Sequence, residues 1–374
     1  MNILAYVHLR NIHRSTGAGR VARQLTEQVA RRDGVNMHIL ADEADHDVIV
    51  PKVGQPWTSF PYHLFSSDTS KQQARWLLTH RPKAEDFWPQ AQIVHCTGES
   101  YVPTSRSRLV VTVHDAAYFE QTAHKQNFSS IKQQLKWRLL FATLARTVDV
   151  FHTVSHFSAE RLGEFFPAIR GRLRVIHNAV TQRFFWPVNS AGEEFMARTG
   201  LAQKRYILVP GGLHYRKNAD LILGAWPILQ ERVSGLTLVV SGHCHPELAA
   251  RAQTLRSVQL TGFVEDDELC ALYHGAQAVW FPSRYEGFGL PVVEAMACGA
   301  PVVASDSSSI PEIAAKDALL VSPNSLEENV DALEAVLNDC SLRERLCVQG
   351  RGRAAQFTWP IAAAQLQELY ASIL

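Results

Sequence analysis

Two glutamates, Glu286 and Glu294, flank a short glycine-containing loop and are separated by seven residues. The loop is Gly287-Phe288-Gly289, and the apolar segment 278–283 before it predicts a buried strand. Pro291 and Gly299 after the loop fit the start and the end of a helix. Backbone N–H groups at a helix N-terminus favour phosphate. Carboxylates would repel phosphate, but they accept hydrogen bonds from hydroxyls. The combination predicts a ligand that carries both groups, a sugar nucleotide.

A second group of polar residues lies in the stretch ILVPGGLHYRKN, residues 207–218. Gly211 and Gly212 follow a predicted strand, and Arg216 and Lys217 precede a predicted helix. Two cations at a helix start oppose the helix dipole, which disfavours a purely structural role. A bound diphosphate would remove this conflict, because a guanidinium can contact two oxygens while an ammonium acts as a point charge. A solvated surface is the alternative interpretation.

The N-terminal half also contains residues suited to contact a ligand. His114 directly follows the apolar segment 109–113, and ligands of open parallel sheets bind at the carboxyl ends of the strands. Gly17 and Gly19 open a helical pattern and would let a phosphate or sugar approach the backbone. Their spacing also fits a dinucleotide-binding fingerprint, but nine residues separate them from the preceding strand, so we disfavour NAD binding. The structural alternative is that the two glycines only allow close packing at the start of a helix.

Alternating strands and helices must position these side chains. Continuous apolar segments alternate with amphipathic stretches, which predicts α/β architecture with parallel sheets covered on both faces. The strands are too many for one sheet, so we expect two doubly wound domains, with the boundary within 175–189 and the active site in a cleft between them. The strand candidates are 2–7, 37–40, 93–96, 109–113, 150–154 and 173–176, followed by 206–211, 236–242, 258–262, 278–283, 301–305 and 318–322.

Length and composition fit a globular protein of two domains. The chain has 374 residues, of which 46% are hydrophobic, and a formal net charge of +1, which gives no reason to expect a nucleic-acid partner. Its six cysteines show no CxxC pair, which indicates reduced thiols in a cytoplasmic protein. No apolar run is long enough for a signal peptide or a membrane span.

Two short motifs suggest a metal, and we predict that neither binds one. Asp45 and Asp47 match the metal-binding DxD motif of another class of sugar transferases, but the polar stretch around them predicts a solvated loop. His243-Cys244-His245 is a tight cluster without a distant pair of ligands, unlike a zinc site.

The segment 284–313, RYEGFGLPVVEAMACGAPVVASDSSSIPEI, closely resembles the donor-site signature of glycosyltransferase family 4, retaining enzymes with the GT-B fold. Segments 153–162, 175–180, 216–218 and 260–269 also resemble this family, in its order, so that the likeness covers nearly the whole chain and is weakest over 41–92. It implies two doubly wound Rossmann-like domains that face each other across a cleft. Residues 1–180, with a returning helix at 358–374, would form the acceptor-side domain, and residues 181–357 the nucleotide-sugar domain.

The same resemblance implies a role for each candidate residue. Glu286 would contact hydroxyls of the donor sugar and Glu294 the ribose, while Lys217 would bind the diphosphate. The family's second cation is missing at Gly211-Gly212, and Arg216 would replace it. The further positions implied to contact the donor are Gly212, Gly287, Phe288, Gly289 and Leu290, the main chain at Phe263 and Val264 for the base, Gly17 and Gly19 for the diphosphate, and His114 for the reacting sugar.

The implied activity is metal-independent transfer of a hexose with retention at the anomeric carbon, without a cofactor. The sequence patterns GGLHYRKN and TVHD favour mannose from GDP-mannose, with a glycan or a lipid-linked saccharide as acceptor; UDP- or dTDP-sugar donors are the alternatives. The competing functions are a sugar-nucleotide 2-epimerase of the same fold, a non-catalytic sensor of nucleotide sugars and an NAD-dependent oxidoreductase.

Peripheral contact with the inner face of a membrane is a further expectation. The segment 127–146 predicts a helix with Lys132 and Lys136 one turn apart and Trp137 beside them, which suits an anionic membrane surface. An ordinary amphipathic helix with a solvated face is the alternative.

Overall fold

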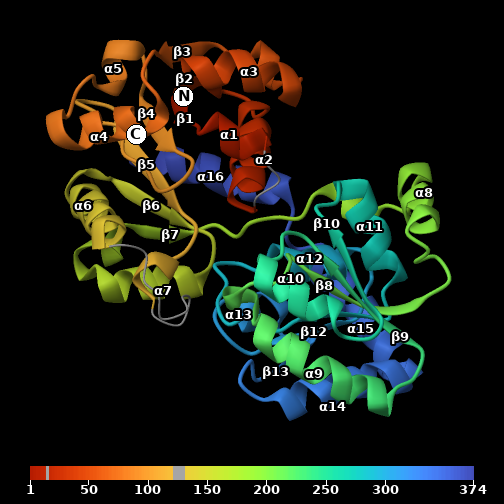
Figure 1. Cartoon of the computed structure of the whole chain (residues 1–374). Helices are drawn as coiled ribbons and strands as arrows, with labels where there is room; N and C mark the ends of the chain where they lie inside the picture. The colour runs from red at the N-terminus through yellow and green to blue at the C-terminus, as the bar shows by residue number, and fades with distance from the viewer. Residues whose placement is uncertain (14–16, 121–130) are drawn as a thin grey trace. The chain divides into compact units, whose positions relative to one another are not determined.

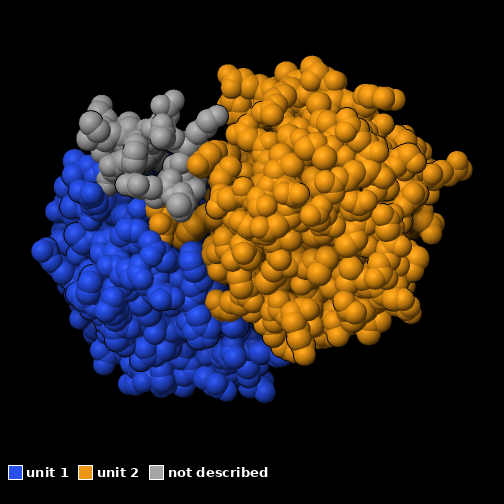
Figure 2. Space-filling model, turned by 90° about the horizontal axis from the view of Figure 1, so that it is seen from below, with its two compact units in different colours: residues 1–119, 128–178, 359–374 blue, residues 120–127, 179–358 orange. Residues whose placement is uncertain are grey.

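The computed structural model describes residues 1–13, 17–120 and 131–374, and side chains after the second gap are described from residue 135 onwards. The chain divides into two compact units, which are coloured separately in Figure 2. Among the described residues, unit 1 comprises 1–13, 17–119, 131–178 and 359–374, and unit 2 comprises residue 120 and 179–358.

Unit 1 is built on a seven-stranded parallel sheet in the order β3-β2-β1-β4-β5-β6-β7 (Figure 1). Strand β1 lies in the middle, with Ile3 paired to Met37 on one side and to Ile93 on the other. Strand β3, YHLF, was not predicted, because it lies at the sheet edge and three of its four residues are only partly buried, so its apolar signal is weak. The strands are β1 Asn2–Tyr6, β2 Asn36–Asp42, β3 Tyr62–Phe65, β4 Ile93–Cys96, β5 Arg108–Val113, β6 Val150–Thr153 and β7 Leu173–Val175.

Helices cover both faces of this sheet (Figure 1). The expectation of a solvated loop at Asp45 and Asp47 is wrong, because both residues lie in helix α3. The carboxylate of Asp42 caps this helix by accepting a hydrogen bond from the Asp45 backbone N–H at 3.2 Å. Asp45 is itself buried and pairs with Arg10 at 2.7 Å. The helices are α1 Leu9–His13, α2 Gly17–Ala30, α3 Glu43–Val53, α4 Thr69–Thr79, α5 Ala84–Phe87, α6 Ile131–Thr147, α7 His156–Phe165 and α16 Trp359–Ile373.

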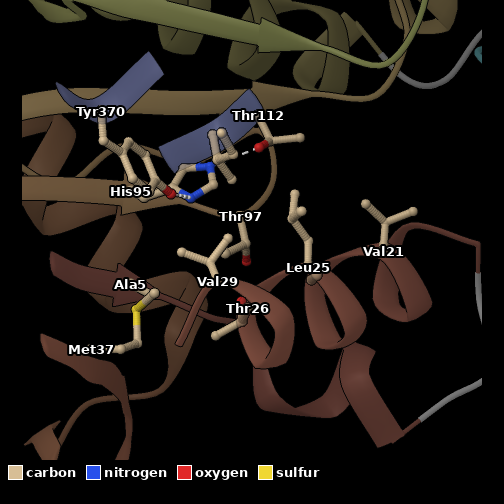
Figure 3. A pocket seen from close by; sticks show the side chains of 12 residues that line it. Ala5, Val21, Leu25, Thr26, Val29, Met37, His95, Thr97, Thr112 and Tyr370 are labelled. Atoms are coloured by element: carbon tan, nitrogen blue, oxygen red, sulfur yellow. Dashed lines mark hydrogen bonds between the residues drawn. The ribbon is translucent and has the colours of Figure 1, made fainter. Parts of the chain in front are cut away.

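Helix α16 belongs to unit 1, as the returning helix predicted from the sequence, and it packs against α2. A buried chain of hydrogen bonds ties it to the sheet (Figure 3). Tyr370 Oη lies 2.6 Å from His95 Nδ1, His95 Nε2 lies 2.8 Å from Thr112 Oγ1, and that hydroxyl lies 2.9 Å from His152 Nδ1. A small, mostly apolar cavity beside this chain is a gap in the packing of α2, α16 and the sheet.

Unit 2 contains a six-stranded parallel sheet in the order β10-β9-β8-β11-β12-β13. Its core is centred on the fully buried Trp226 and Trp280, and the Trp280 indole N–H donates to Asn329 Oδ1 at 2.9 Å. The strands are β8 Arg205–Pro210, β9 Leu236–Ser241, β10 Val258–Gly262, β11 Ala278–Phe281, β12 Val302–Ser305 and β13 Leu319–Val321. The helices are α8 Ser190–Arg198, α9 Ala219–Arg232, α10 Pro246–Gln253, α11 Asp266–Gly275, α12 Leu290–Ala297, α13 Ile310–Ala314, α14 Leu326–Asn338 and α15 Cys340–Ala354.

The two sheets confirm the predicted pair of doubly wound α/β units. None of the helices that the structure describes combines the length and the apolar character needed to cross a bilayer.

Candidate functional site

The predicted order of strand, glycine loop and helix is found between β11 and α12. Gly289 is the N-cap of α12 and has a left-handed backbone, with φ 97° and ψ 46°. The left-handed conformation favours glycine, and a Cβ atom at this position would also lie 2.5 Å from Ile310 Cδ1, so the isoleucine side chain would have to move. Pro291 occupies the first turn of the helix, and Gly299, with φ 73°, follows its C-cap.

A serine-rich segment after β12 supports this loop, and it was not predicted from the sequence. The Glu286 backbone N–H donates to Ser308 Oγ at 2.9 Å, and Ser309 Oγ donates to the Glu286 carbonyl at 3.0 Å. The position of Ser307–Ser309 directly after a predicted strand was the signal that could have identified them.

Lys217 and Glu286 form a buried ion pair at the start of the loop. Lys217 Nζ lies 2.7 Å from Glu286 Oε1, and each side chain is only 9% exposed. The ammonium also lies over the ring of Phe281 at the end of β11, 4.1 Å from its centroid. The structure therefore joins two predicted site residues that lie 69 positions apart in the sequence.

The pair shapes the charge of the surrounding site. Burial lowers the pKa of Lys217, although Glu286 opposes this shift. Burial alone would raise the pKa of Glu286, but the charges of Lys217 and Arg216 outweigh it and hold that pKa below its ordinary value. Burial, followed by the same two cations, lowers the pKa of His214 to about 4. Lys217 and Arg216 thus place two cations beside Glu286, and such cations suit an anionic ligand such as a diphosphate.

The diglycine after β8 is explained by close packing. Gly212 has φ 80°, and a Cβ atom there would lie 1.7 Å from the carbonyl oxygen of His243. Gly211 has φ 91°, and a Cβ atom there would lie 3.0 Å from Lys217 Cε. A cation or any other side chain directly after β8 would collide with the loop after β9 or with the Lys217 stem.

Arg216 lies beside Lys217 in the short 3₁₀ turn Tyr215–Lys217, and its carbonyl accepts a hydrogen bond from the Arg284 N–H at 2.9 Å. This contact connects the diglycine segment to the residues just before Glu286. Arg216 therefore contributes charge to the Lys217–Glu286 pair, as its effect on both pKa values indicates.

Glu294 lies about one turn into α12, which begins directly after the loop, and it is only 4% exposed. Tyr273 on α11 donates its hydroxyl to Glu294 Oε2 at 3.2 Å. Tyr273 was not predicted as a site residue, because it lies within a helix and not at the end of a strand. The two glutamates thus have different neighbours, a lysine for Glu286 and a tyrosine for Glu294.

The remaining predicted residues of unit 2 divide into exposed and buried positions. Phe263 directly follows β10 and is 61% exposed, whereas Val264 is buried. The ring of Phe288 packs edge-on against Phe357 at 5.6 Å, so its side chain anchors the glycine loop in the core. Leu290 is also buried, which leaves the main chain as the part of the loop suited to a ligand.

In unit 1, His114 follows β5, as predicted. Its backbone N–H donates to Glu99 Oε1 at 2.7 Å, and Ser158 Oγ donates to its carbonyl at 3.3 Å. Burial raises the pKa of Glu99, against the opposing charge of His114. Glu99 was missed, although it follows β4 as His114 follows β5. Gly17 and Gly19 form the first turn of α2.

The two short motifs that suggest a metal in the sequence lie outside the groups of side chains that could hold one. Among the described residues, neither Asp45 and Asp47 nor the stretch 243–245 belongs to a three-ligand cluster.

Comparison with known proteins agrees with this geometry. Residues 15–183 match the family model described as Glycosyltransferase Family 4, and residues 192–353 match that of Glycosyl transferases group 1. The O-antigen chain mannosyltransferase B of Escherichia coli is 30% identical over 283 residues, which cover 72% of this chain and 72% of that protein. The chain belongs to glycosyltransferase family 4.

Solved structures show the GT-B fold of this glycosyltransferase. Sucrose-phosphate synthase from Thermosynechococcus elongatus has a TM-score of 0.75 at 20% identity, covering 100% of this chain and 99% of the other. Anabaena HepE, solved in complex with UDP and glucose, has a TM-score of 0.71 at 18% identity and covers 100% of both chains. The glycosyltransferase is thus an enzyme with two Rossmann-like units.

Proposed function

We propose that this glycosyltransferase transfers mannose from GDP-mannose to a glycan or a lipid-linked saccharide, with retention at the anomeric carbon and without a catalytic metal. The observation that carries the proposal is the buried Lys217–Glu286 pair at the start of the glycine loop. It places a cation for phosphate beside a carboxylate for hydroxyls, and those are the two chemical groups of a sugar nucleotide.

Departure of the nucleoside diphosphate builds negative charge on phosphate, so the reaction needs positive charge at that point. Lys217, Arg216 and the N-terminal end of α12 supply it, which takes the place of a divalent ion. In the protein without donor, Glu286 balances the buried charge of Lys217. When a donor binds, the ammonium can donate its other N–H groups to the diphosphate, while Glu286 accepts from hydroxyls of the sugar.

The other residues take roles consistent with their positions. Glu294 binds the ribose hydroxyls, and the main chain at Phe263 and Val264 contacts the base. His114 of unit 1 contacts the transferred sugar, and Gly17 and Gly19 let the backbone approach the diphosphate. The glycine loop, residues 287–289, and the start of α12 at Leu290 hold sugar and phosphate through the main chain, because the Phe288 side chain is committed to the core.

The choice of mannose is supported by the E. coli relative, which is a mannosyltransferase. The alternative is a UDP-sugar, since the structurally similar HepE was solved with UDP and glucose. A dTDP-sugar also remains an alternative. A 2-epimerase of the same fold is disfavoured, because membership of the glycosyltransferase family implies transfer to an acceptor.

Calorimetry with GDP, UDP and dTDP, followed by transfer assays with the corresponding sugar nucleotides, tests the proposal. We expect GDP to bind most tightly and GDP-mannose to be turned over with retention, as read from the anomeric configuration of the product. Lys217→Ala should weaken binding of the diphosphate and transfer by at least about tenfold, since it removes a charged hydrogen-bond donor. Tighter binding of UDP, with turnover of a UDP-sugar, would establish the alternative donor.

We further propose that α6 brings the enzyme to an anionic membrane that carries its acceptor. Leu135 and Leu139 are 66% and 48% exposed, and Lys136 between them is exposed as well. Trp137 stacks on Tyr118, with ring centroids 3.7 Å apart, so it is held by the protein. The Lys132 side chain and residues 127–130 lie outside what the structure describes. Apolar side chains flanked by a basic one suit the surface of an anionic bilayer.

Co-sedimentation with anionic vesicles tests this surface. We expect Lys136→Glu combined with Leu135→Ser to reduce the bound fraction severalfold, whereas Lys71→Glu, on an exposed face of α4, should not. Equal binding by the wild type and the α6 variant would exclude a membrane role of this helix.

A further inference from the structure

Two buried cysteines and a histidine meet between α11 and α12. Cys270 and His274 lie one turn apart on α11, and Cys298 is the C-cap of α12. The sulfur atoms of Cys270 and Cys298 are 3.9 Å apart, and one ligand atom from each of the three side chains lies within 4.8 Å of the others. Both cysteines are buried, whereas solvent reaches His274.

The separation of the two sulfur atoms matches a shared tetrahedral ion. Zinc–thiolate bonds of about 2.3 Å at a tetrahedral angle place two sulfurs about 3.8 Å apart. A disulfide would instead require the sulfurs to approach to about 2.05 Å. The observed 3.9 Å therefore fits metal coordination without movement of either helix.

The surroundings of His274 resemble the second coordination sphere of a metal site. His274 Nε2 lies 3.1 Å from the carbonyl oxygen of Trp186. A ligating histidine commonly donates its other ring N–H to such a carbonyl, which fixes the ring and its tautomer. Donation from Nε2 to Trp186 would leave Nδ1 for the ion.

The charges around the cluster also tolerate a divalent cation. Arg183 lies close to Cys270, but it is paired with Asp267 on the same helix as Cys270, so the two charges largely cancel. Two thiolates would neutralise the two charges of the ion.

We propose that Cys270, His274 and Cys298 bind one thiophilic divalent cation of the zinc class, with water in the fourth position. The ion joins α11 to α12 and takes no part in glycosyl transfer. This proposal differs from the expectation from the sequence that the chain binds no metal. The sequence signal of this site is a cysteine and a histidine four residues apart, and local spacing does not connect them with the distant Cys298.

Metal analysis and cobalt substitution test the site directly. Purified protein, dialysed against Zn²⁺ and then against metal-free buffer, should retain about one zinc per chain, because three side-chain ligands are already assembled. Replacement by Co²⁺ should give intense thiolate-to-cobalt charge-transfer absorption and the visible bands of a tetrahedral ion. Bound Zn²⁺ should also protect Cys270 and Cys298 from alkylation.

Single substitutions identify the ligands. Cys270→Ser, Cys298→Ser and His274→Ala should each lose the cobalt charge-transfer bands or weaken them strongly, and retained zinc should fall at least about tenfold. Cys340→Ser and Cys244→Ser are matched controls, because Cys340 is exposed and Cys244 belongs to the histidine-flanked motif, and both should bind zinc as the wild type does. His274→Ala is the variant least prone to misfold, since solvent already reaches that side chain.

The outcomes separate this site from the proposed function. The metal site would be overturned if the wild type bound no zinc. It would also be overturned if His274→Ala, Cys270→Ser and Cys298→Ser all retained zinc. Either result would leave the glycosyltransferase proposal intact. Oxidation of Cys270 and Cys298 to a disulfide under air, with no zinc retained by the reduced protein, would also overturn the metal site. Transfer by zinc-depleted His274→Ala should stay within about threefold of the wild type, since the ion is not catalytic.

Discussion

Lys217 shares its ammonium between a carboxylate and an aromatic ring, whereas Glu294, from the same site, depends on a tyrosine hydroxyl. The proposed function assigns separate tasks to Glu286 and Glu294, and their different neighbours support this. Under the proposed function, Glu286 compensates the buried cation Lys217 and accepts from sugar hydroxyls, whereas Glu294 accepts from Tyr273 and acts on Lys217 through its charge.

Substitutions of the two glutamates should therefore affect nucleotide binding and glycosyl transfer differently. Glu294→Gln should weaken binding of the bare nucleoside diphosphate by about ten- to a hundredfold, because a hydrogen bond to a charged group is lost. Glu286→Gln should leave that affinity unchanged or increase it, since Lys217 loses its competing partner, yet transfer should fall. Calorimetry with the bare nucleotide beside transfer assays separates the roles.

Folding controls belong to this experiment, because removing one member of a buried ion pair costs about 3–5 kcal/mol of stability. Thermal denaturation of each variant shows whether it is folded at the assay temperature. Tyr273→Phe removes a partner of Glu294 without removing its carboxylate, and should weaken nucleotide binding less than Glu294→Gln does. Equal losses of nucleotide affinity in both glutamate variants would contradict the separate roles.

At the scale of elements, the loops after β8 and β9 pack so closely that glycine is required. We expect Gly212→Ala to lower the stability of unit 2 by more than about 2 kcal/mol, because the new Cβ would lie 1.7 Å from the His243 carbonyl oxygen. Gly235→Ala is the matched control in unit 2, since Gly235 also has a positive φ, 74°, but no atom lies within 4 Å of its added Cβ. It should cost only about 1–2 kcal/mol.

Chemical denaturation of both glycine variants measures the difference. Donor binding by Gly212→Ala, in conditions where the variant is still folded, should fall as well, because Lys217 and Arg216 follow directly in the chain. Equal losses of stability in the two variants would mean that backbone conformation alone, and not the contact with His243, requires the glycine.

Strongly patterned elements were predictable, and side-chain partnerships between distant segments were not. Buried strands such as β5 and β11 carry continuous apolar runs, and the glycine loop with its following proline marks the start of α12. The edge strand β3 and the helix α3 lack such patterns, so they were missed. The contact of Glu286 with Ser308 depends on how parallel strands bring their following loops together. The contacts of Glu294 with Tyr273 and of Cys270 with Cys298 depend on how α11 packs against α12. Local sequence specifies neither arrangement.

At the scale of the whole molecule, two buried histidines make stability depend on pH. Burial lowers the pKa of His95 to about 3 and that of His152 to about 4. In the unfolded chain both would titrate near about 6.5. Above that pH both histidines are neutral in the folded and in the unfolded chain, so they do not change the stability. As the pH falls below it, protons bind the unfolded chain but not the folded one, so stability decreases by up to about 1.4 kcal/mol per unit for each histidine.

Denaturation from about pH 7 to about pH 5 checks this dependence. His95→Gln should lose stability less steeply over this range than the wild type does. Tyr370→Phe should lower stability by about 1–3 kcal/mol at neutral pH, because His95 Nδ1 loses its buried partner, while the slope remains. A His95→Gln slope equal to that of the wild type would show that His95 does not contribute.

Glycosyl transfer should not depend on magnesium or manganese. Activity in EDTA should change by less than about twofold on addition of either ion, because side-chain cations and a helix terminus serve the diphosphate. Abolition by EDTA with rescue by Mn²⁺ would contradict this and would show that transfer needs a divalent ion. Rescue by Zn²⁺ alone, together with a recovered denaturation midpoint, would instead point to the cysteine cluster.

The place of α16 has a consequence for how the chain is made. Residues 359–374 leave the ribosome after all of unit 2, yet they supply Leu366 and Tyr370 to the core of unit 1. Unit 2 is formed by one nearly continuous stretch and can fold during synthesis, whereas unit 1, although its synthesis starts first, must wait for α16. Until then the face of unit 1 that α16 will cover, including Val29 and His95, stays open to chaperones and proteases. The half of the enzyme that is synthesised first is therefore the half that is completed last.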